Sequence, residues 1–144
     1  MRRLAVLFAA LLAMPAWARD PLVIIVNPES GVTRLTRQEV ENIYMGRQRR
    51  LPSGLMALPV EEMFPAETRL RFYQTLVHLP MPEVRAYWAR MYFSGQCQPP
   101  RQTETAEETL EVIAANKGAI GFLARSKVDR RVRVVLELEP SAEP

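Results

Sequence analysis

The chain is poor in the side chains that build metal centres and nucleophilic active sites. Its 144 residues include one histidine, His78, and one cysteine, Cys97. A single cysteine excludes an intramolecular disulfide, and the sequence holds no compact His, Cys and Asp cluster with metal-ligand spacing. We expect Cys97 to be an inert or partly buried thiol, because no basic residue or helix start beside it favours the thiolate. Neither a metal site nor a cofactor is predicted.

The residue patterns of an enzyme are missing as well. His78 is accompanied by no G-x-S-x-G or similar nucleophile motif, and we interpret it as a residue at the C-terminal end of a helix. Glu61 and Glu62 are adjacent carboxylates, but neighbours along a strand point to opposite faces of a sheet. We expect both to be surface charges at a strand end. The sequence therefore predicts no catalytic residue.

Long apolar runs are absent except at the N-terminus. Arg2 and Arg3 precede the apolar residues 4–14, and a small-residue site, Ala-Trp-Ala, follows at 16–18. This is the layout of a cleavable secretory signal, and the run is too short to span a bilayer comfortably. We predict a signal peptide at 1–18, one domain at 19–138, a flexible tail at 139–144 and a periplasmic location. A retained signal anchor is the alternative.

An excess of positive charge is also lacking once the signal is removed. The formal net charge is +3, but two arginines leave with the signal, so seventeen basic residues face sixteen acidic ones. This balance gives no support for a nucleic-acid partner. Arg47, Arg49 and Arg50 could form an anion or partner patch, and we interpret them as a solvated loop.

Strand and helix patterns alternate along the remaining chain. Residues 21–27 are continuously apolar and β-branched, which predicts a buried strand, and runs at 56–60, 119–124 and 133–138 predict three more. Helices are predicted at 36–45, between Pro65 and Pro80, after Pro82, and from Thr105 to Asn116. This order favours an open mixed α/β sheet of about four strands flanked by helices.

Apolar residues at helical spacing predict which helix faces are buried. In the second helix these residues are Leu70, Tyr73, Leu76 and Val77. In the third helix Trp88 and Tyr92 lie four apart on one face, which is more typical of core than of a ligand platform.

Four sequence segments, in this order, resemble the periplasmic substrate-binding proteins of phosphate ABC transporters. They are Val26-Asn27-Pro28, Leu35–Val40, Ile43–Arg47 and Lys117–Phe122, the last of which reads Lys-Gly-Ala-Ile-Gly-Phe. The resemblance implies a single lobe of a type 2 periplasmic-binding-protein-like fold. It also implies phosphate or another small oxyanion as the ligand, and a membrane transporter or sensor as the partner.

The chain departs from the pattern of that family in two ways. The family's phosphate-binding loop carries Ser-Gly-Thr at a helix N-terminus, whereas residues 63–69 here keep only Thr68 as a hydroxyl. Pro65 lacks an N–H donor, and Glu67 places negative charge where the anion would sit. The chain also has residues for little more than one of the two lobes that enclose a ligand. We therefore expect weak or lost phosphate binding.

Topology predicts the ligand-binding residues. In open α/β sheets, ligands gather beyond the carboxyl ends of strands and near helix N-termini. The residues that fit this rule are Asn27, Ser30, Thr68 and Arg69. Arg69 offers a forked contact to an oxyanion, and a plain surface arginine is the alternative. Two functions stay open, a solute-binding module and a protein-interaction or sensory accessory domain.

Overall fold

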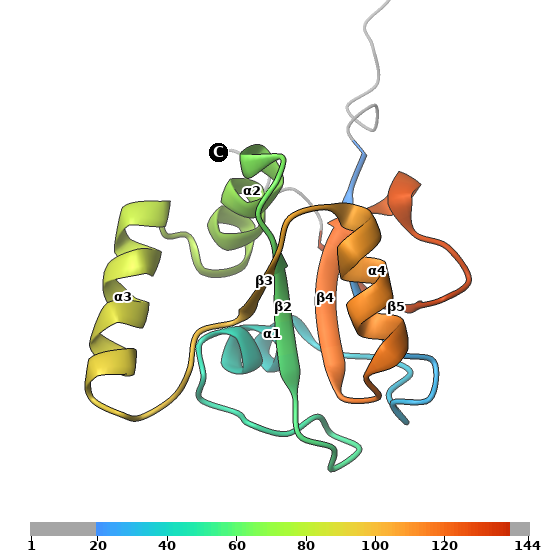
Figure 1. The fold of residues 1–144 in the computed structure, drawn as a ribbon, viewed down its shortest axis with the longest axis horizontal. Helices are drawn as coiled ribbons and strands as arrows, with labels where there is room; N and C mark the ends of the chain where they lie inside the picture. Colours follow the sequence, from blue (N-terminus) through green and yellow to red (C-terminus); the bar gives the residue numbers. More distant parts are fainter. Residues whose placement is uncertain (1–19, 139–144) are drawn as a thin grey trace, which may run out of the picture.

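Five strands form one mixed sheet in a computed structural model that describes residues 20–138 (Figure 1). The predicted signal peptide and the predicted tail lie outside the described residues. The strand order is β3-β2-β4-β1-β5. The strands are β1 (Leu22–Val26), β2 (Leu58–Glu62), β3 (Arg101–Thr103), β4 (Ala119–Ala124) and β5 (Arg133–Leu138).

The strand directions decide which loops share an end of the sheet. β1 runs antiparallel to β4, with Val26 opposite Ile120, while β2 runs parallel to β4, with Pro59 opposite Ile120. The carboxyl end of β1 therefore lies beside the amino ends of β2 and β4. The carboxyl end of β2 lies at the other end of the sheet.

Four α-helices flank the sheet. They are α1 (Arg37–Tyr44), α2 (Ala66–Val77), α3 (Met81–Phe93) and α4 (Ala106–Ala115). The predicted capping box of α1 is present, with Thr36 and Glu39 each bonding the other's backbone N–H. At the end of α2, His78 adopts a left-handed conformation with φ of 58° as the helix C-cap, so its predicted position is confirmed.

Each face of the sheet has its own apolar cluster. Ile24, Phe122 and Phe72 belong to the cluster beneath α1, α2 and α3, where the rings of Phe72 and Phe122 stack 3.8 Å apart. Val23 and Ile113 belong to the cluster beneath α4. Because successive residues of β1 serve opposite clusters and the whole strand is buried, its continuous apolar sequence follows from the layering. The result is a three-layer α/β/α arrangement.

The predicted fold class is confirmed, with several local corrections. The sheet has a fifth strand, β3, in a stretch that begins where a loop rich in glycine, glutamine and proline was expected. β2 extends over Glu61 and Glu62, two residues beyond the predicted strand, and both carboxylates are buried. β3 pairs with this end of β2, and α2 packs against β2, so the expectation of surface charge was wrong.

Two predicted core positions are exposed. Leu70 of α2 is 46% exposed, and its place in the core is taken by Phe72. Trp88 of α3 is buried as expected, but Tyr92 is 60% exposed. The second half of α3 packs against the core through Trp88 and Met91, and Tyr92 and Phe93 at the end of the helix are left uncovered.

Among residues 20–138, no helix combines the length and the apolar character that crossing a membrane requires.

Candidate functional site

The four predicted ligand-binding residues do not lie together. Asn27 and Ser30 follow β1, and Thr68 and Arg69 belong to the first turns of α2, which follows β2. Because β1 and β2 run in opposite directions, the two pairs lie at opposite ends of the sheet. The rule that ligands gather beyond the carboxyl ends of strands therefore points to two separate places in this mixed sheet.

Asn27 and Ser30 hold backbone groups of the domain. The Asn27 amide donates to the carbonyls of Ile113 and Ala114, at 2.9 and 3.0 Å, and so caps the C-terminal end of α4. Its side-chain oxygen accepts from the Glu29 N–H, and the Ser30 hydroxyl accepts from the Val32 N–H. Both residues are buried, at 4% and 1% exposure. A ligand role for either stays a prediction.

Arg69 is neither a surface arginine nor a free anion contact. Its guanidinium lies 3.1 Å from a carboxylate oxygen of Glu61, and its side chain is only 16% exposed. The Nε–H of Arg69 is buried and has no acceptor within the described part of the chain. Glu61 thus pairs with one terminal nitrogen of the guanidinium and neutralises its charge, and a ligand role for Arg69 stays a prediction.

Glu61 is the centre of a buried polar cluster at the carboxyl end of β2. Besides Arg69, its carboxylate accepts from the Tyr73 hydroxyl at 2.5 Å and from the Gln102 amide at 3.2 Å. Burial, and then the negative charge of Glu61, raise the pKa of Tyr73 well above its usual range. Tyr73 therefore stays protonated and acts as a donor. The sequence signal for this cluster is the pair of carboxylates on a strand beside a helix that carries Arg69 and Tyr73 at i and i+4.

Glu62 is buried differently from Glu61. It is 1% exposed, and its Oε1 has no donor among residues 20–138. Burial raises the pKa of its carboxyl, and the positive charge of Lys127 partly offsets that rise. A desolvated carboxylate without a full set of donors repels other anions and favours protonation.

The start of α2 lacks a side-chain cap and carries an acidic residue in its first turn. Pro65 is the N-cap, so the helix has no side-chain cap bond, and the Thr68 N–H is directed to the Pro65 carbonyl at 3.1 Å. Glu67 stands in the first turn, where it interacts favourably with the positive end of the helix dipole. Thr68 is half-buried. Glu61 and Glu62 end β2 and Glu67 stands in the first turn of α2, while Arg69 is paired with Glu61 and the positive charge of Lys127 acts on Glu62.

A metal site is not formed here either. Within residues 20–138, no three His, Cys, Asp or Glu side chains come together in a way that could hold an ion.

Solved structures similar to this chain include phosphate-transport binding proteins. The chain superimposes on an ABC-type phosphate transport receptor from Vibrio cholerae with a TM-score of 0.64 and 20% identity, over 81% of this chain and 45% of that one. For a phosphate ABC transporter substrate-binding protein from Clostridium perfringens with bound phosphate, the TM-score is 0.62 and the identity 17%, over 81% and 44% of the two chains. For PstS from Borrelia burgdorferi the values are 0.59 and 13%, over 81% and 46%.

The chain therefore has the fold of a phosphate-transporter substrate-binding protein, and it matches one lobe of that class. It spans less than half the length of each of these three structures. No protein-family model matches the chain, and no curated protein matches its sequence. At these identities the likeness establishes the fold and not the activity of this chain.

Proposed function

We propose that this protein is a periplasmic module of the substrate-binding-protein type that is not an enzyme and has weak or no affinity for phosphate at the start of α2. The pairing of Arg69 with buried Glu61 carries the proposal. The Arg69 guanidinium, the predicted contact for an oxyanion, is neutralised by Glu61 inside the domain. An incoming phosphate would have to displace a carboxylate that two other donors also hold.

Charge and geometry near the helix start support the same conclusion. Phosphate carries one to two negative charges at neutral pH, and helix N-termini bind it through free backbone N–H groups. Pro65 supplies no N–H, and Glu67 is exposed in the first turn. A site that opens to solvent on one side also leaves much of a ligand hydrated, which reduces affinity further.

Calorimetry of the protein with phosphate and sulfate tests the proposal. We expect dissociation constants no tighter than about 1 mM, which corresponds to about 4 kcal/mol of binding free energy. Glu61→Gln removes the competing charge, and we expect it to strengthen phosphate binding by several-fold if the variant folds. Glu111→Gln, which neutralises a carboxylate on the exposed face of α4, is the control for net charge. Micromolar binding of phosphate by the unaltered protein would overturn the proposal.

A protein-interaction or sensory role is the second candidate. Phe64, directly before α2, is 62% exposed, and Leu70 in the same helix is 46% exposed. Uncovered apolar side chains beside a helix start are suited to contact with another protein, such as a membrane transporter or sensor.

Photocrosslinking from single positions distinguishes this candidate from solute binding. A photoreactive amino acid at position 64 should yield one discrete adduct with a membrane protein in intact cells. Phe93, which is 85% exposed at the far end of α3, provides the control position. Equal adducts from both positions, or none from position 64, would contradict docking through α2.

A further inference from the structure

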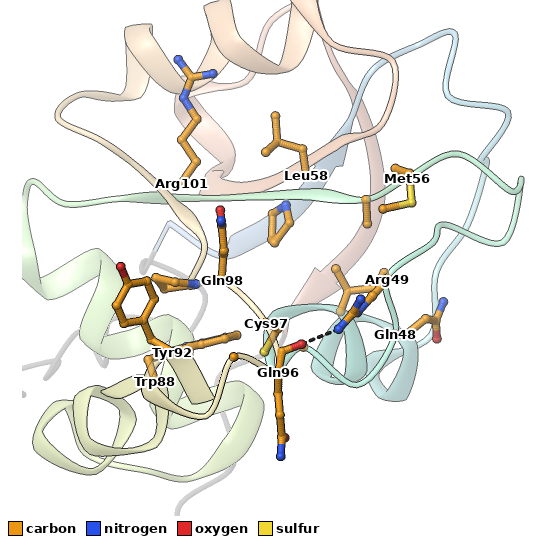
Figure 2. A pocket seen from close by; sticks show the side chains of 16 residues that line it. Gln48, Arg49, Met56, Leu58, Trp88, Tyr92, Gln96, Cys97, Gln98 and Arg101 are labelled. Carbon is orange, nitrogen blue, oxygen red and sulfur yellow. Dashed lines mark hydrogen bonds between the residues drawn. The ribbon is translucent and has the colours of Figure 1, made fainter. Parts of the chain in front are cut away.

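A cavity of about 790 Å³ opens at the end of the domain opposite the start of α2 (Figure 2). It is enclosed by the end of α1, the amino-terminal half of β2, the second half of α3, and the segment 95–101 that leads into β3. Its volume lies in the range of small-molecule sites in proteins. Glu61, Arg69 and Tyr73 are not among the residues that line the cavity, so it is a different site from the Glu61 cluster.

The wall of the cavity is aromatic and apolar. Trp88 and Tyr92 of α3 line one side, and Cys97, Pro59 and Ala57 contribute on the others. The Nε1–H of Trp88 is buried and meets no acceptor in the described chain. Gly46 allows Cys97 to pack closely against the end of α1, because a Cβ at position 46 would lie 2.6 Å from the Cys97 sulfur. The cavity is thus bounded by closely packed residues on one side and is open on the other.

The charged residues known to line the cavity are basic. Among residues 20–138 the lining includes two arginines, Arg49 and Arg101, and no aspartate or glutamate. Within residues 20–138, neither arginine has a carboxylate at salt-bridge distance. Arg49 reaches across the opening and donates to the backbone carbonyl of Gln96, as the dashed line in Figure 2 shows. A guanidinium without a carboxylate partner in the described chain therefore stands beside an aromatic cavity.

From this combination we infer that the cavity binds a small aromatic carboxylate, with the ring against Trp88 and Tyr92 and the carboxylate on Arg49. Aromatic rings pack well against Trp and Tyr, and a guanidinium matches the two oxygens of a carboxylate. A cationic ligand would meet like charge without any compensating carboxylate. The inference concerns a site separate from the helix start of the proposed function, so either can fail without the other.

Titration of the full chain with 3-phenylpropanoate, and with its uncharged amide as the comparison, tests the inference. Calorimetry measures affinity, and the indole N–H signal of Trp88 in ¹H–¹⁵N NMR spectra, assigned with a Trp88→Phe variant, reports the site. We expect the acid to bind with a dissociation constant near or below about 1 mM and the amide to bind at least about fivefold more weakly. The Trp88 signal should shift in step with the calorimetric saturation.

Two pairs of variants locate the ligand. Arg49→Gln should weaken binding of the acid by about five- to tenfold, whereas Arg85→Gln, the same charge change on the exposed face of α3, should change it less than about twofold. Tyr92→Ala should weaken both ligands, whereas Phe93→Ala, an adjacent and more exposed aromatic that does not line the cavity, should not. Equal binding of acid and amide, an unchanged Trp88 signal at about 10 mM acid, or equal losses within either pair would overturn the inference.

Discussion

The two ends of β2 are built in opposite ways. At the carboxyl end, charged and polar groups are buried and held to one another, with Glu61 bonded to Arg69, Tyr73 and Gln102. At the amino end, residues 56–59 line a cavity, and Arg49 has no carboxylate partner within the described chain. The comparison teaches that an arginine near a helix start indicates an anion site only when no internal carboxylate already holds it.

The carboxyl end of β2, with the Glu61 cluster, is the closed end, and the amino end, beside the cavity, is the open end. The largest expected effect concerns the closed end. Glu61→Ala should lower the free energy of unfolding by about 3–5 kcal/mol, because it leaves Arg69 largely buried without a counter-charge. Urea denaturation followed by circular dichroism measures the loss. Glu67→Ala, at an exposed carboxylate in the first turn of α2, should cost less than about 0.5 kcal/mol. Similar losses for the two variants would show that the Glu61 cluster is solvated.

Removal of one donor from the same cluster should have an intermediate effect. Tyr73→Phe deletes the hydroxyl that donates to Glu61, and a hydrogen bond to a charged acceptor contributes about 2 kcal/mol. The matched variant is Tyr87→Phe, whose hydroxyl donates to the uncharged carbonyl of Met45 near the open end. This second change should cost about 1 kcal/mol. A larger loss for Tyr87→Phe would reverse the comparison between the two ends.

Glu62 should make stability depend on pH in the opposite direction from an ion-paired carboxylate. Burial raises its folded-state pKa above the usual value of 4.5, so the folded protein holds this proton more tightly than the unfolded chain does. The resulting stabilisation is complete below about pH 4.5 and is lost as pH rises through the folded pKa. Glu62→Gln should therefore be more stable than the unaltered protein at pH 7, by about 1 kcal/mol.

Thermal melts of the two proteins between pH 4 and pH 8 measure this difference, which should shrink toward acidic pH. Glu67→Gln serves as the surface control and should show no such trend. A constant difference across the pH range would mean that Glu62 does not titrate in the folded state as described.

The smallest expected effect lies at the open end. Tyr92→Ala should change the free energy of unfolding by less than about 0.5 kcal/mol, because the side chain is 60% exposed and completes no closed core. Denaturation with urea provides the measurement. A loss of 2 kcal/mol or more, of the order that truncating a core side chain costs, would show that the cavity is packed rather than open.

Local patterns carried the prediction of the helices and most strands. Thr36 with Glu39 sets the start of α1 through contacts within four residues, so the sequence alone places it. β3 was missed because three residues beside prolines and glutamines carry no strand signal, and their pairing with Val60–Glu62 is a contact across some forty residues. Tyr92 was misassigned because helical spacing identifies a face but not how far along the helix that face is covered.

The candidate site was predicted less well than the fold, for a reason that concerns strand direction. The sequence shows where Asn27 and Arg69 stand relative to their own strands, but not whether those strands run the same way. Since β1 pairs antiparallel with β4, the two residues lie at opposite ends of the sheet. The buried partners of these two residues were not predicted either. The α4 carbonyls that Asn27 binds are distant in sequence, and Glu61, which pairs with Arg69, was expected at the surface.

The sequence by itself determined the α/β class, the likeness to one lobe of a phosphate-transporter binding protein and the absence of Ser-Gly-Thr from residues 63–69, because these depend on residue type and near neighbours. Only the tertiary structure decided that Glu61 holds Arg69, that Glu62 is buried and that a cavity opens between α3 and β2. Those features depend on which strands pair, in which direction, and which helix covers them, and long-range packing sets all three.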